Sequence, residues 1–555
     1  MKLKHTSKYG AVALAVFVGM AASSGVAFAK KKAFEPLNDA DFETAKSLYF
    51  QQCAGCHGVL RVGATGGNLE PHPNKAKKSK GTLKKGTKRL EKIITLGTEG
   101  GMNNFDNILS KKEINILARY IQMEPPIPPE MSLALMKERH KVYVKPEDYP
   151  TKPLHNRNWK NFFIAIERDA GNVVIMDGDK KEVFARVKTG YAVHVLKTVE
   201  KNKATKPAKN PGRFWYTMGR DGLMTKLDLW QTPDNMIIAS TQIAYDARDV
   251  AVSGDGKYVI GGGYWPPHFV ILEAATMEPL KVVSSRGVNI DGDYVNESRV
   301  AAIYDTPHDS SWLVAMKELG QMWQVHYDDI DNLKITKMDT AKYLHDGFFD
   351  PTGRYFQIAA NASDTMVVVD TKTQKLEALI KTDKKPHPGP GANWIDPKCG
   401  PVGGTVHLGV GKLTVWGNDK KGHKDEAWKI CYTVDTDGPG VFLRTHPKSD
   451  YVWMDQTLHP EPEVQQSIKI LDKKTRKVVK TIRVTEKKGY VAVHFEFNQA
   501  GDEVWVSIWN RSTSLKPNGE MVIYDAKTLK EKARVKGLYA PTGKFNVYNR
   551  VNHVT

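Results

Sequence analysis

From about residue 155 onward the sequence repeats a short pattern, and this repeat constrains the fold more than any other feature. A turn followed by an apolar strand with an aromatic residue recurs, as in Asp255–Val259 and Thr352–Phe356. The copies centre on residues 162, 214, 258, 312, 355, 405, 451 and 503, so the period is about 49 residues. Four short strands per copy predict an all-β eight-bladed propeller. A long sandwich array is the alternative, but it would not need so regular a period.

The segments that join one blade to the next gather at one end of a propeller's central channel. Read in order, these segments carry His194, Arg248, Arg299, His345, His387, His494 and Thr542. Three or more histidines at one phase of the repeat favour a site for an anionic ligand over packing. One imidazole could bind a second metal or a haem iron, and others could donate protons to a bound anion. The tail Pro541–Tyr548 is predicted to supply the strand that closes the ring.

Ahead of the repeat lies Cys53-Ala-Gly-Cys-His57, a C-x-x-C-H segment that is typical of haem c attachment. Cys53 and Cys56 can bond to the haem from one helical turn, and the imidazole of His57 then reaches the iron. A zinc site would require a second Cys or His pair, and the other cysteines, Cys399 and Cys431, lie far away in the sequence. A redox dithiol is the minor alternative.

Three helices are predicted around this segment, over residues 40–57, Gly86–Thr95 and Ser110–Met123. Asp39 or Asp41 can cap the first, and Ser110 with Glu113 forms a capping box for the third. The pattern predicts a small all-α cytochrome c domain over residues 30–130, which ends in a Pro-rich linker. The propeller would then occupy residues 131–555.

The iron of haem c needs a sixth ligand, and a methionine suits electron transfer because it raises the reduction potential. Met102 lies in a Gly-rich loop between the second and third predicted helices, where it can fold over the far face of the haem. Met123, Met131 and His72 are the alternatives.

The first 29 residues predict export. Lys2, Lys4 and Lys8 precede an apolar run at Ala11–Met20, and Ala27–Ala29 is a cleavage site. A membrane anchor is the alternative, but the run is short for one, and no other stretch is long and apolar enough to span a bilayer. We therefore expect a periplasmic or equivalent compartment. There Cys399 and Cys431 could form a disulfide or remain free thiols.

The formal net charge is +19, and export argues against nucleic acid as the partner. Many lysines lie between Lys75 and Lys88. They form either a solvated face or a docking surface for an acidic electron carrier.

Several segments resemble those of cytochrome cd1 nitrite reductases across nearly the whole mature chain. They are Thr189–His194, Gly263–Pro267, Leu344–Gly347, Lys385–Gly389, Gly391–Asn393, Thr445–Ser449 and Pro541–Asn549. The resemblance implies reduction of nitrite to nitric oxide at haem d1 in the propeller, with electrons relayed through haem c. It also implies a soluble donor, such as a small cytochrome c or a cupredoxin, and a homodimer.

The resemblance assigns roles to individual residues. His194 would bind the haem d1 iron, and His57 and Met102 would bind the haem c iron. His345 and His387 match the distal histidines that bind and protonate nitrite. Positions that contact haem d1 are matched by Arg220, Arg248, Tyr264 and Thr542.

Three positions depart from the family pattern. Lys197 and Pro390 stand where arginines are usual, and His494 stands where a glutamine is usual. Lysine keeps the charge of arginine but loses its bidentate fork. We therefore expect the haem d1 carboxylates to be held differently or more weakly. The alternatives are a haem d1 maturation dehydrogenase, for which haem d1 is a product, and a non-enzymatic dihaem electron carrier.

Overall fold

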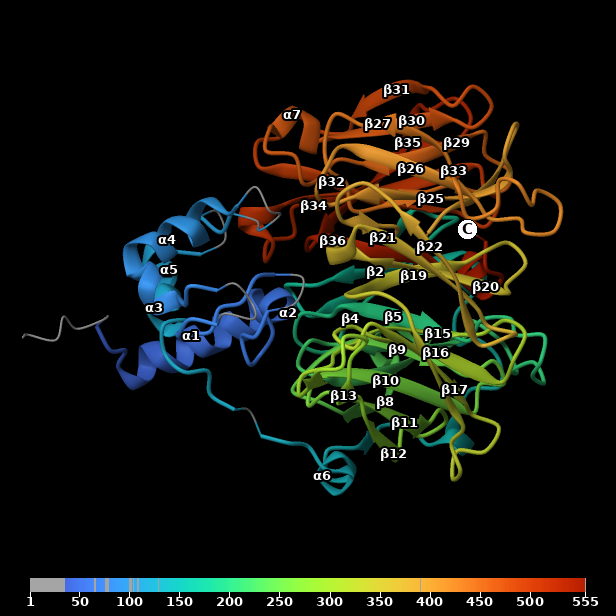
Figure 1. Cartoon of the computed structure of the whole chain (residues 1–555). Coiled ribbons are helices and arrows are strands. Elements are labelled where there is room, and N and C mark those ends of the chain that lie inside the picture. Colours follow the sequence, from blue (N-terminus) through green and yellow to red (C-terminus); the bar gives the residue numbers. More distant parts are fainter. Residues whose placement is uncertain are drawn as a thin grey trace, which may run out of the picture.

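The chain forms a small helical domain that lies against one end of a large β-propeller (Figure 1). The computed structural model describes residues 35–63, 66–74, 79–98, 102, 104–106, 109–127, 129–389 and 391–554. The predicted signal segment, Lys75–Lys78 and Pro390 lie outside these residues, as do residues 99–101, 103, 107 and 108 of the loop around Met102. Within the described ranges no helix has the length and apolar character needed to cross a membrane.

The helical domain contains the three predicted helices, with one of them divided in two. Its helices are α1 (Asp39–Gln52), α2 (Ala54–His57), α3 (Thr82–Lys85), α4 (Thr87–Leu96) and α5 (Lys111–Tyr120). The helix expected over 40–57 is interrupted at Cys53, and its N-cap is Asn38 rather than Asp39 or Asp41, because the Asn38 side chain accepts a hydrogen bond from the Asp41 amide. The capping box of Ser110 and Glu113 is confirmed.

A buried arginine organises the core of this domain. Arg61 is fully buried between the rings of Tyr49 and Tyr120, at 5.1 and 4.4 Å from their centroids. Its guanidinium also donates hydrogen bonds to the carbonyls of Tyr120 and Met123. Cation–π contacts of this kind gain strength when they are desolvated.

The propeller consists of eight antiparallel sheets in the part of the chain that the structure describes. Blades 1 to 4, from the inner strand outward, are β36 (Pro541–Asn546), β2 (Phe162–Glu167), β3 (Asn172–Asp177), β4 (Glu182–Lys188); β5 (Val195–Thr198), β6 (Phe214–Met218), β7 (Leu223–Asp228), β8 (Ile237–Gln242); β9 (Asp246–Val252), β10 (Tyr258–Trp265), β11 (His268–Glu273), β12 (Pro279–Ser284); and β15 (Val300–Asp305), β16 (Ser311–Met316), β17 (Gln321–His326), β18 (Ile335–Asp339).

The remaining blades follow the same order. They are β19 (Leu344–Phe349), β20 (Tyr355–Ala360), β21 (Thr365–Asp370), β22 (Lys375–Lys381); β23 (Pro386–His387), β25 (Gly400–His407), β26 (Lys412–Gly417), β27 (Ile430–Asp435); β28 (Leu443–Arg444), β29 (Tyr451–Asp455), β30 (Ser467–Asp472), β31 (Val478–Arg483); and β32 (Tyr490–Phe497), β33 (Glu503–Asn510), β34 (Gly519–Asp525), β35 (Glu531–Leu538). The eight-bladed fold class is thereby confirmed.

Several shorter strands and helices lie outside the four-stranded blades. They are β1 (Lys141–Val142), which pairs with β8; β24 (Asn393–Asp396), which pairs with β25; the hairpin β13 (Gly287–Val288) and β14 (Tyr294–Val295); α6 (Leu133–Glu138), α7 (Pro462–Gln465) and α8 (Val547–Val551); and the 3-10 helices η1 (Pro146–Asp148), η2 (Trp159–Asn161), η3 (Pro233–Asn235), η4 (Asn361–Ser363) and η5 (Arg511–Thr513).

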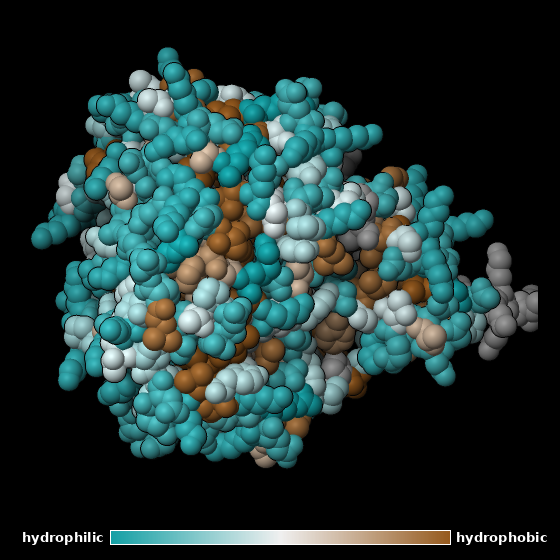
Figure 2. Space-filling model, turned by 180° about the vertical axis from the view of Figure 1, so that it is seen from behind, coloured by the Kyte–Doolittle hydropathy of each residue, from teal (hydrophilic) through white to brown (hydrophobic). Residues whose placement is uncertain are grey.

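The ring closes as the sequence predicts, because β36 from the C-terminal tail is the innermost strand of the first blade. It pairs with β2, and Ile164 lies opposite Phe545 in the register. Middle strands such as β16 and β20 are buried along their whole length, since each is covered by the two adjacent blades, whereas the outer strand β31 is largely exposed. Hydrophilic side chains dominate the surface seen in Figure 2, with apolar ones gathered in a band across the blades.

The two cysteines of the sixth blade form a disulfide. Cys399, directly before β25, is bonded to Cys431 in β27, 32 positions further along the chain. Sequence alone left this pairing open against free thiols. Because the cross-link restricts the unfolded chain, it stabilises the blade.

We expect the double variant Cys399→Ser/Cys431→Ser to lower the free energy of unfolding of the propeller by about 3 to 4 kcal/mol, the value for a loop of this length. Thermal unfolding followed by circular dichroism measures the effect. Reductant should lower the melting temperature of the wild type and leave the double variant unchanged. If the double variant has the same melting temperature as the oxidised wild type, the prediction is wrong.

Candidate cofactor site

The histidines and arginines that share one phase of the repeat lie at the end of the propeller that faces the helical domain. His194 directly precedes β5, Arg248 lies in β9, and His345 and His387 lie in β19 and β23. The turn between β6 and β7 places Arg220 at the same end, where its Nη1 donates a hydrogen bond to the Gln51 carbonyl of α1. Residues far apart in the sequence are thus brought to one mouth of the central channel.

One ring nitrogen of His194 is engaged by the propeller. Its Nδ1 lies 2.9 Å from the Arg248 carbonyl, which orients the ring and leaves Nε2 for a ligand bond. The ring is exposed by its surface area, yet burial, helped by Arg220 and Arg248, holds its pKa well below the usual value. Both observations hold if the imidazole faces an enclosed space.

Two neighbouring side chains likewise combine exposed surface with a pKa that burial shifts. Tyr191 is 41% exposed, but burial raises its pKa to about 12. The His345 side chain is 35% exposed, but burial lowers its pKa despite the opposing carboxylate of Asp346. Both side chains are therefore partly desolvated although each keeps exposed surface.

His345 and His387 form a compact pair around one carboxylate. Their ring centroids are 5.0 Å apart. Asp346 reaches both rings, with Oδ1 at 2.5 Å from His345 Nδ1 and Oδ2 at 3.7 Å from His387 Nε2. Burial acts to raise the pKa of Asp346, but the two imidazoles hold it at about 2. The carboxylate is therefore ionised and supports protonation of its partners.

The chemistry of this triad suits either proton transfer or metal binding. The three potential ligand atoms lie within 4.8 Å of one another, a spacing that a metal ion also accepts. However, His387 Nδ1 already contacts the Val441 carbonyl at 2.7 Å, and the carboxylate is shared between the rings. When protonated, these two imidazoles can donate hydrogen bonds to a small anion.

His494 lies deeper in the channel than the other histidines. It is 2% exposed, and its ring packs edge-on against Phe442 at 4.5 Å. Asp455 connects the backbone at His494 with the segment that contacts His387. Its Oδ2 accepts a hydrogen bond from the His494 amide, and its Oδ1 accepts one from the amide of Val441, whose carbonyl contacts His387. Burial raises the pKa of Asp455 to about 6.

The arginines at the mouth differ in how many hydrogen-bond and ion-pair partners the protein gives them. Arg248 is paired with Asp246 and lies 4.5 Å from the ring of Tyr264. Arg220 Nε is buried and has no hydrogen-bond partner among the described residues, and burial together with Arg248 and Arg168 lowers the pKa of Arg220 to about 9. An unpaired buried guanidinium N–H is costly, so this position fits the carboxylate of a large anionic cofactor such as haem d1.

Two other residues matched to cofactor contacts are bonded within the propeller. Lys197 Nζ donates to Asp249 Oδ2 at 2.9 Å and to the Ile303 carbonyl, and it lies over the ring of Tyr304. Thr542 Oγ1 lies 3.3 Å from the Ile166 carbonyl in the closing strand.

The haem c segment has the donor set that covalent attachment requires. Cys53 and Cys56 are both free thiols. His57 Nδ1 lies 2.6 Å from the Gly67 carbonyl, which leaves Nε2 for the iron. The apolar surroundings of Cys53 raise its pKa to about 12, and the residue packs against the helical core. These features fit a haem held against the core of the domain.

The structure separates the candidates for the sixth ligand. Met102 packs against the same apolar core as Cys53. Met131 instead packs with Met136 in the propeller, and His72 points outward in an ion pair with Glu124. Met131 and His72 thus lie apart from this core, whereas Met102 packs against it and Met123 remains in the same domain, where its carbonyl accepts a hydrogen bond from Arg61.

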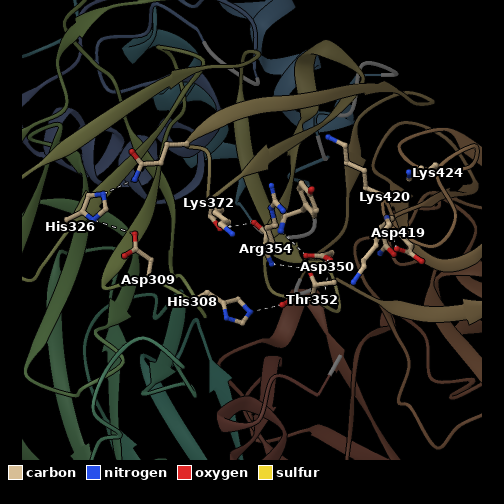
Figure 3. Close-up of a pocket in the computed structure, with 15 residues that line it drawn as sticks. His308, Asp309, His326, Asp350, Thr352, Arg354, Lys372, Asp419, Lys420 and Lys424 are labelled. Atoms are coloured by element: carbon tan, nitrogen blue, oxygen red, sulfur yellow. Dashed lines mark hydrogen bonds and ion pairs between the residues drawn. The ribbon is translucent and has the colours of Figure 1, made fainter.

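A groove of about 1010 Å³ lies at the opposite ends of the blades and is not part of this site (Figure 3). His308 and Thr352 on its wall lie in the turns that follow β15 and β19, whereas His345 lies where β19 begins. Its histidines are already engaged, His308 with the Thr352 carbonyl and His326 with Asp309 and Gln374. We assign no cofactor to this groove.

Sequence reasoning missed several residues that shape the site. Asp346 directly follows His345 in the segment Leu344–Gly347, and this adjacency is the sequence feature from which it could have been predicted. Asp246 and Asp455 hold Arg248 and His494, but nothing in their local sequence marks them.

Comparisons with known families match both parts of the chain. The model described as "Cytochrome D1 heme domain" matches residues 157–550, which is more than half of the chain. The model described as "Cytochrome C oxidase, cbb3-type, subunit III" matches residues 40–121.

Individual relatives extend over nearly the whole chain. It is 44% identical to a nitrite reductase of Stutzerimonas stutzeri over 573 aligned positions, which cover 99% of this chain and 100% of the relative. It is 29% identical to a dihydro-heme d1 dehydrogenase of Pseudomonas aeruginosa, with 92% and 94% covered. The solved structure of dihydro-heme d1 dehydrogenase NirN in complex with DHE matches with a TM-score of 0.68 at 27% identity, covering 92% of this chain and 100% of that one.

We expect Met102→His to lower the reduction potential of haem c, because imidazole replaces the thioether that favours the ferrous iron. A redox titration of the haem c absorbance measures the shift. Met123→Ala serves as the control and should keep the wild-type potential. If Met123→Ala shifts the potential and Met102→His does not, Met123 is the ligand.

Proposed function

Because this chain belongs to the cytochrome cd1 nitrite reductases, we propose that His345 and His387 bind nitrite and hold the protons that its reduction consumes. The protein reduces nitrite to nitric oxide with haem c and haem d1 as its cofactors. Each turnover takes up one electron and two protons and releases one water. The chain must therefore supply a place for the anion and a source of protons.

The observation that carries the proposal is the triad of His345, Asp346 and His387 at the mouth that His194 also faces. Ionised Asp346 contacts both rings, and each ring, once protonated, can attract nitrite and donate a proton to it. General acids of this kind contribute about 100- to 10,000-fold to a reaction rate. His387 is oriented by the Val441 carbonyl, so its Nε2 is the atom that carries the transferable proton.

Other residues hold the cofactors in this proposal. When bound, haem d1 supplies the iron at which nitrite is reduced, and haem c relays the electron. His194 Nε2 is the proposed ligand on one side of the haem d1 iron, and His57 Nε2 with Met102 the pair at haem c. The unpaired Nε of Arg220 is suited to a haem d1 carboxylate. Arg248, Tyr264, Lys197, His494 and Thr542 are proposed to complete the pocket.

We further propose that the protein is exported after cleavage near Ala29, with domain limits at 30–130 and 131–555, and acts as a homodimer. An acidic soluble carrier, such as a small cytochrome c or a cupredoxin, is the proposed electron donor. Lys84, Lys88 and Arg89 are exposed on α3 and α4, and the chain carries a net charge of +19. Complementary charge of this kind raises the rate of encounter.

We expect His345→Ala and His387→Ala each to slow nitrite turnover by about 100-fold or more, because each removes a proton donor. Nitrite consumption with a reduced donor measures the rate, and the spectra of both haems confirm equal cofactor content. His308→Ala, in the remote groove, is the matched control and should match the wild type. Full turnover in either site variant would rule out its role as proton donor.

We expect nitrite turnover to fall as the pH rises, because the rate depends on protonated imidazoles. Asp346 opposes the effect of burial on His345, so Asp346→Asn should lower the pKa of His345 further. The pH–rate profile of this variant should therefore shift to lower pH, with a greater loss at pH 7 than at pH 5. Asp346→Glu, which restores the charge, should recover the profile; an unshifted profile in Asp346→Asn would contradict the assignment.

A further inference from the structure

The haem-attachment segment rests on the propeller through two buried side chains of opposite charge. Glu297 and Arg299 lie between the β13–β14 hairpin and β15, and they are 7% and 1% exposed. They are separated by a single residue, so both side chains approach the helical domain from the same short stretch. Figure 1 shows α2 as the part of the helical domain that lies next to the blades.

Glu297 binds the chain directly after His57. Its Oε1 accepts a hydrogen bond from the Val59 amide at 2.6 Å, and its Oε2 accepts one from the Leu60 amide at 2.9 Å. Gly58, which lies between His57 and Val59, has a φ of 83°. A Cβ at this position would lie 3.1 Å from Glu297 Oε2. Glycine therefore allows both the left-handed turn and the close approach of the carboxylate.

Arg299 binds the chain directly before His57. Its Nη1 donates to the carbonyls of Ala54 and Gly55 at 3.0 and 2.9 Å. Its other nitrogens are fixed by Glu318, whose Oε1 accepts from Nε at 2.8 Å and from Nη2 at 2.5 Å. The guanidinium is thus locked to the propeller on one edge and to the C-x-x-C-H segment on the other.

These contacts bracket the residues that bear haem c. Arg248 also lies directly under the segment, since a Cβ at Gly55 would be 3.2 Å from its Nη2. The ring of Tyr264 lies 4.5 Å from Arg248 and 5.2 Å from Arg299. A continuous layer of packed side chains therefore connects the haem c segment with the mouth that His194 faces.

We propose that Glu297 and Arg299 form a clasp that fixes haem c relative to the propeller and so sets the rate of electron transfer between the two haems. This inference rests on the electron relay of the proposed function. With both haems bound, that step would move one electron from haem c to haem d1, and no bond would form or break. Glu297 and Arg299 are positioning residues, because they act through the backbone that carries the haem.

The cost of burying these charges supports a specific role. Burial raises the pKa of Glu297 to about 7, although Arg299 and the two amides oppose the shift. A carboxylate in such a place is retained only where its oxygens are satisfied, and here both are satisfied by the other domain. Small misplacements of reacting groups reduce rates steeply, by up to about 100-fold per ångström in enzymes.

The test compares Glu297→Ala, Glu297→Gln and Arg299→Lys with the wild type, all as holoproteins of equal haem c and haem d1 content. Glu463→Ala is the matched control, because this carboxylate is 80% exposed on α7 at the propeller surface. Hydrogen–deuterium exchange reports the protection of peptides that contain Val59 and Leu60. Rapid reduction of haem c, followed by the spectra of both haems, gives the rate of internal electron transfer.

We expect Glu297→Ala to lose amide protection at residues 59 and 60 and to slow internal electron transfer at least about ten-fold. Glu297→Gln should lie between this variant and the wild type, because the amide keeps one acceptor and opposes the second N–H with a donor. Arg299→Lys keeps the charge but loses the fork, so it should also slow the transfer. The rate at which an external donor reduces haem c should not change.

Unchanged transfer rates in both Glu297 variants would overturn the clasp, whether or not amide protection is lost. A slower transfer in Glu463→Ala of the same size would overturn it as well, because the effect would then not be specific. If the wild type failed to consume nitrite, the proposed function would fail, but exchange and internal transfer would still test the clasp.

Discussion

The pairing of β36 with β2 is the interaction on which the rest of the structure depends. Without it the blades would form an open array, and segments more than 300 residues apart, such as Tyr191–His194 and Pro541–Asn546, would not share one channel. Because the ring is closed, the start of every inner strand reaches the same end. The geometry of the histidines is therefore a consequence of topology rather than of any local contact.

A second consequence of closure is the electrostatic character of the mouth. The side chains gathered there are desolvated, and burial lowers the pKa values of His194, His345 and Arg220. Paired carboxylates offset this penalty at selected places: Asp346 serves the two distal imidazoles and Asp246 serves Arg248. Where no carboxylate is supplied, as at Arg220 Nε, a buried donor is left for an anionic ligand.

The sequence sufficed to predict the blades, the closing strand and the phase of the histidines, because strand and turn signals are local and repeat along the chain. It also predicted a haem c cofactor, since the attachment motif is contiguous; His57 as its ligand stays a prediction. It could not reveal Glu297, whose partners Val59 and Leu60 lie 238 and 237 residues away. Nor could it tell that Met131 packs in the propeller, because helical-domain and propeller methionines look alike in sequence. Asp346 was visible only as a neighbour of His345, and its role depends on the distance to His387.

The contacts of Lys197 and His494 show what these two departures from the family pattern do in the structure. Lys197 is paired with Asp249 and donates to the Ile303 carbonyl, so part of its hydrogen-bonding capacity is used within the propeller. His494 is packed against Phe442 and contacts Lys544, which places it in the channel lining. Among the described residues, Arg220 keeps a buried N–H without a hydrogen-bond partner, and it also holds the Gln51 carbonyl of the helical domain. A cofactor carboxylate at Arg220 would therefore be bound by the same side chain that contacts the haem c domain, so that cofactor binding and domain docking share one guanidinium.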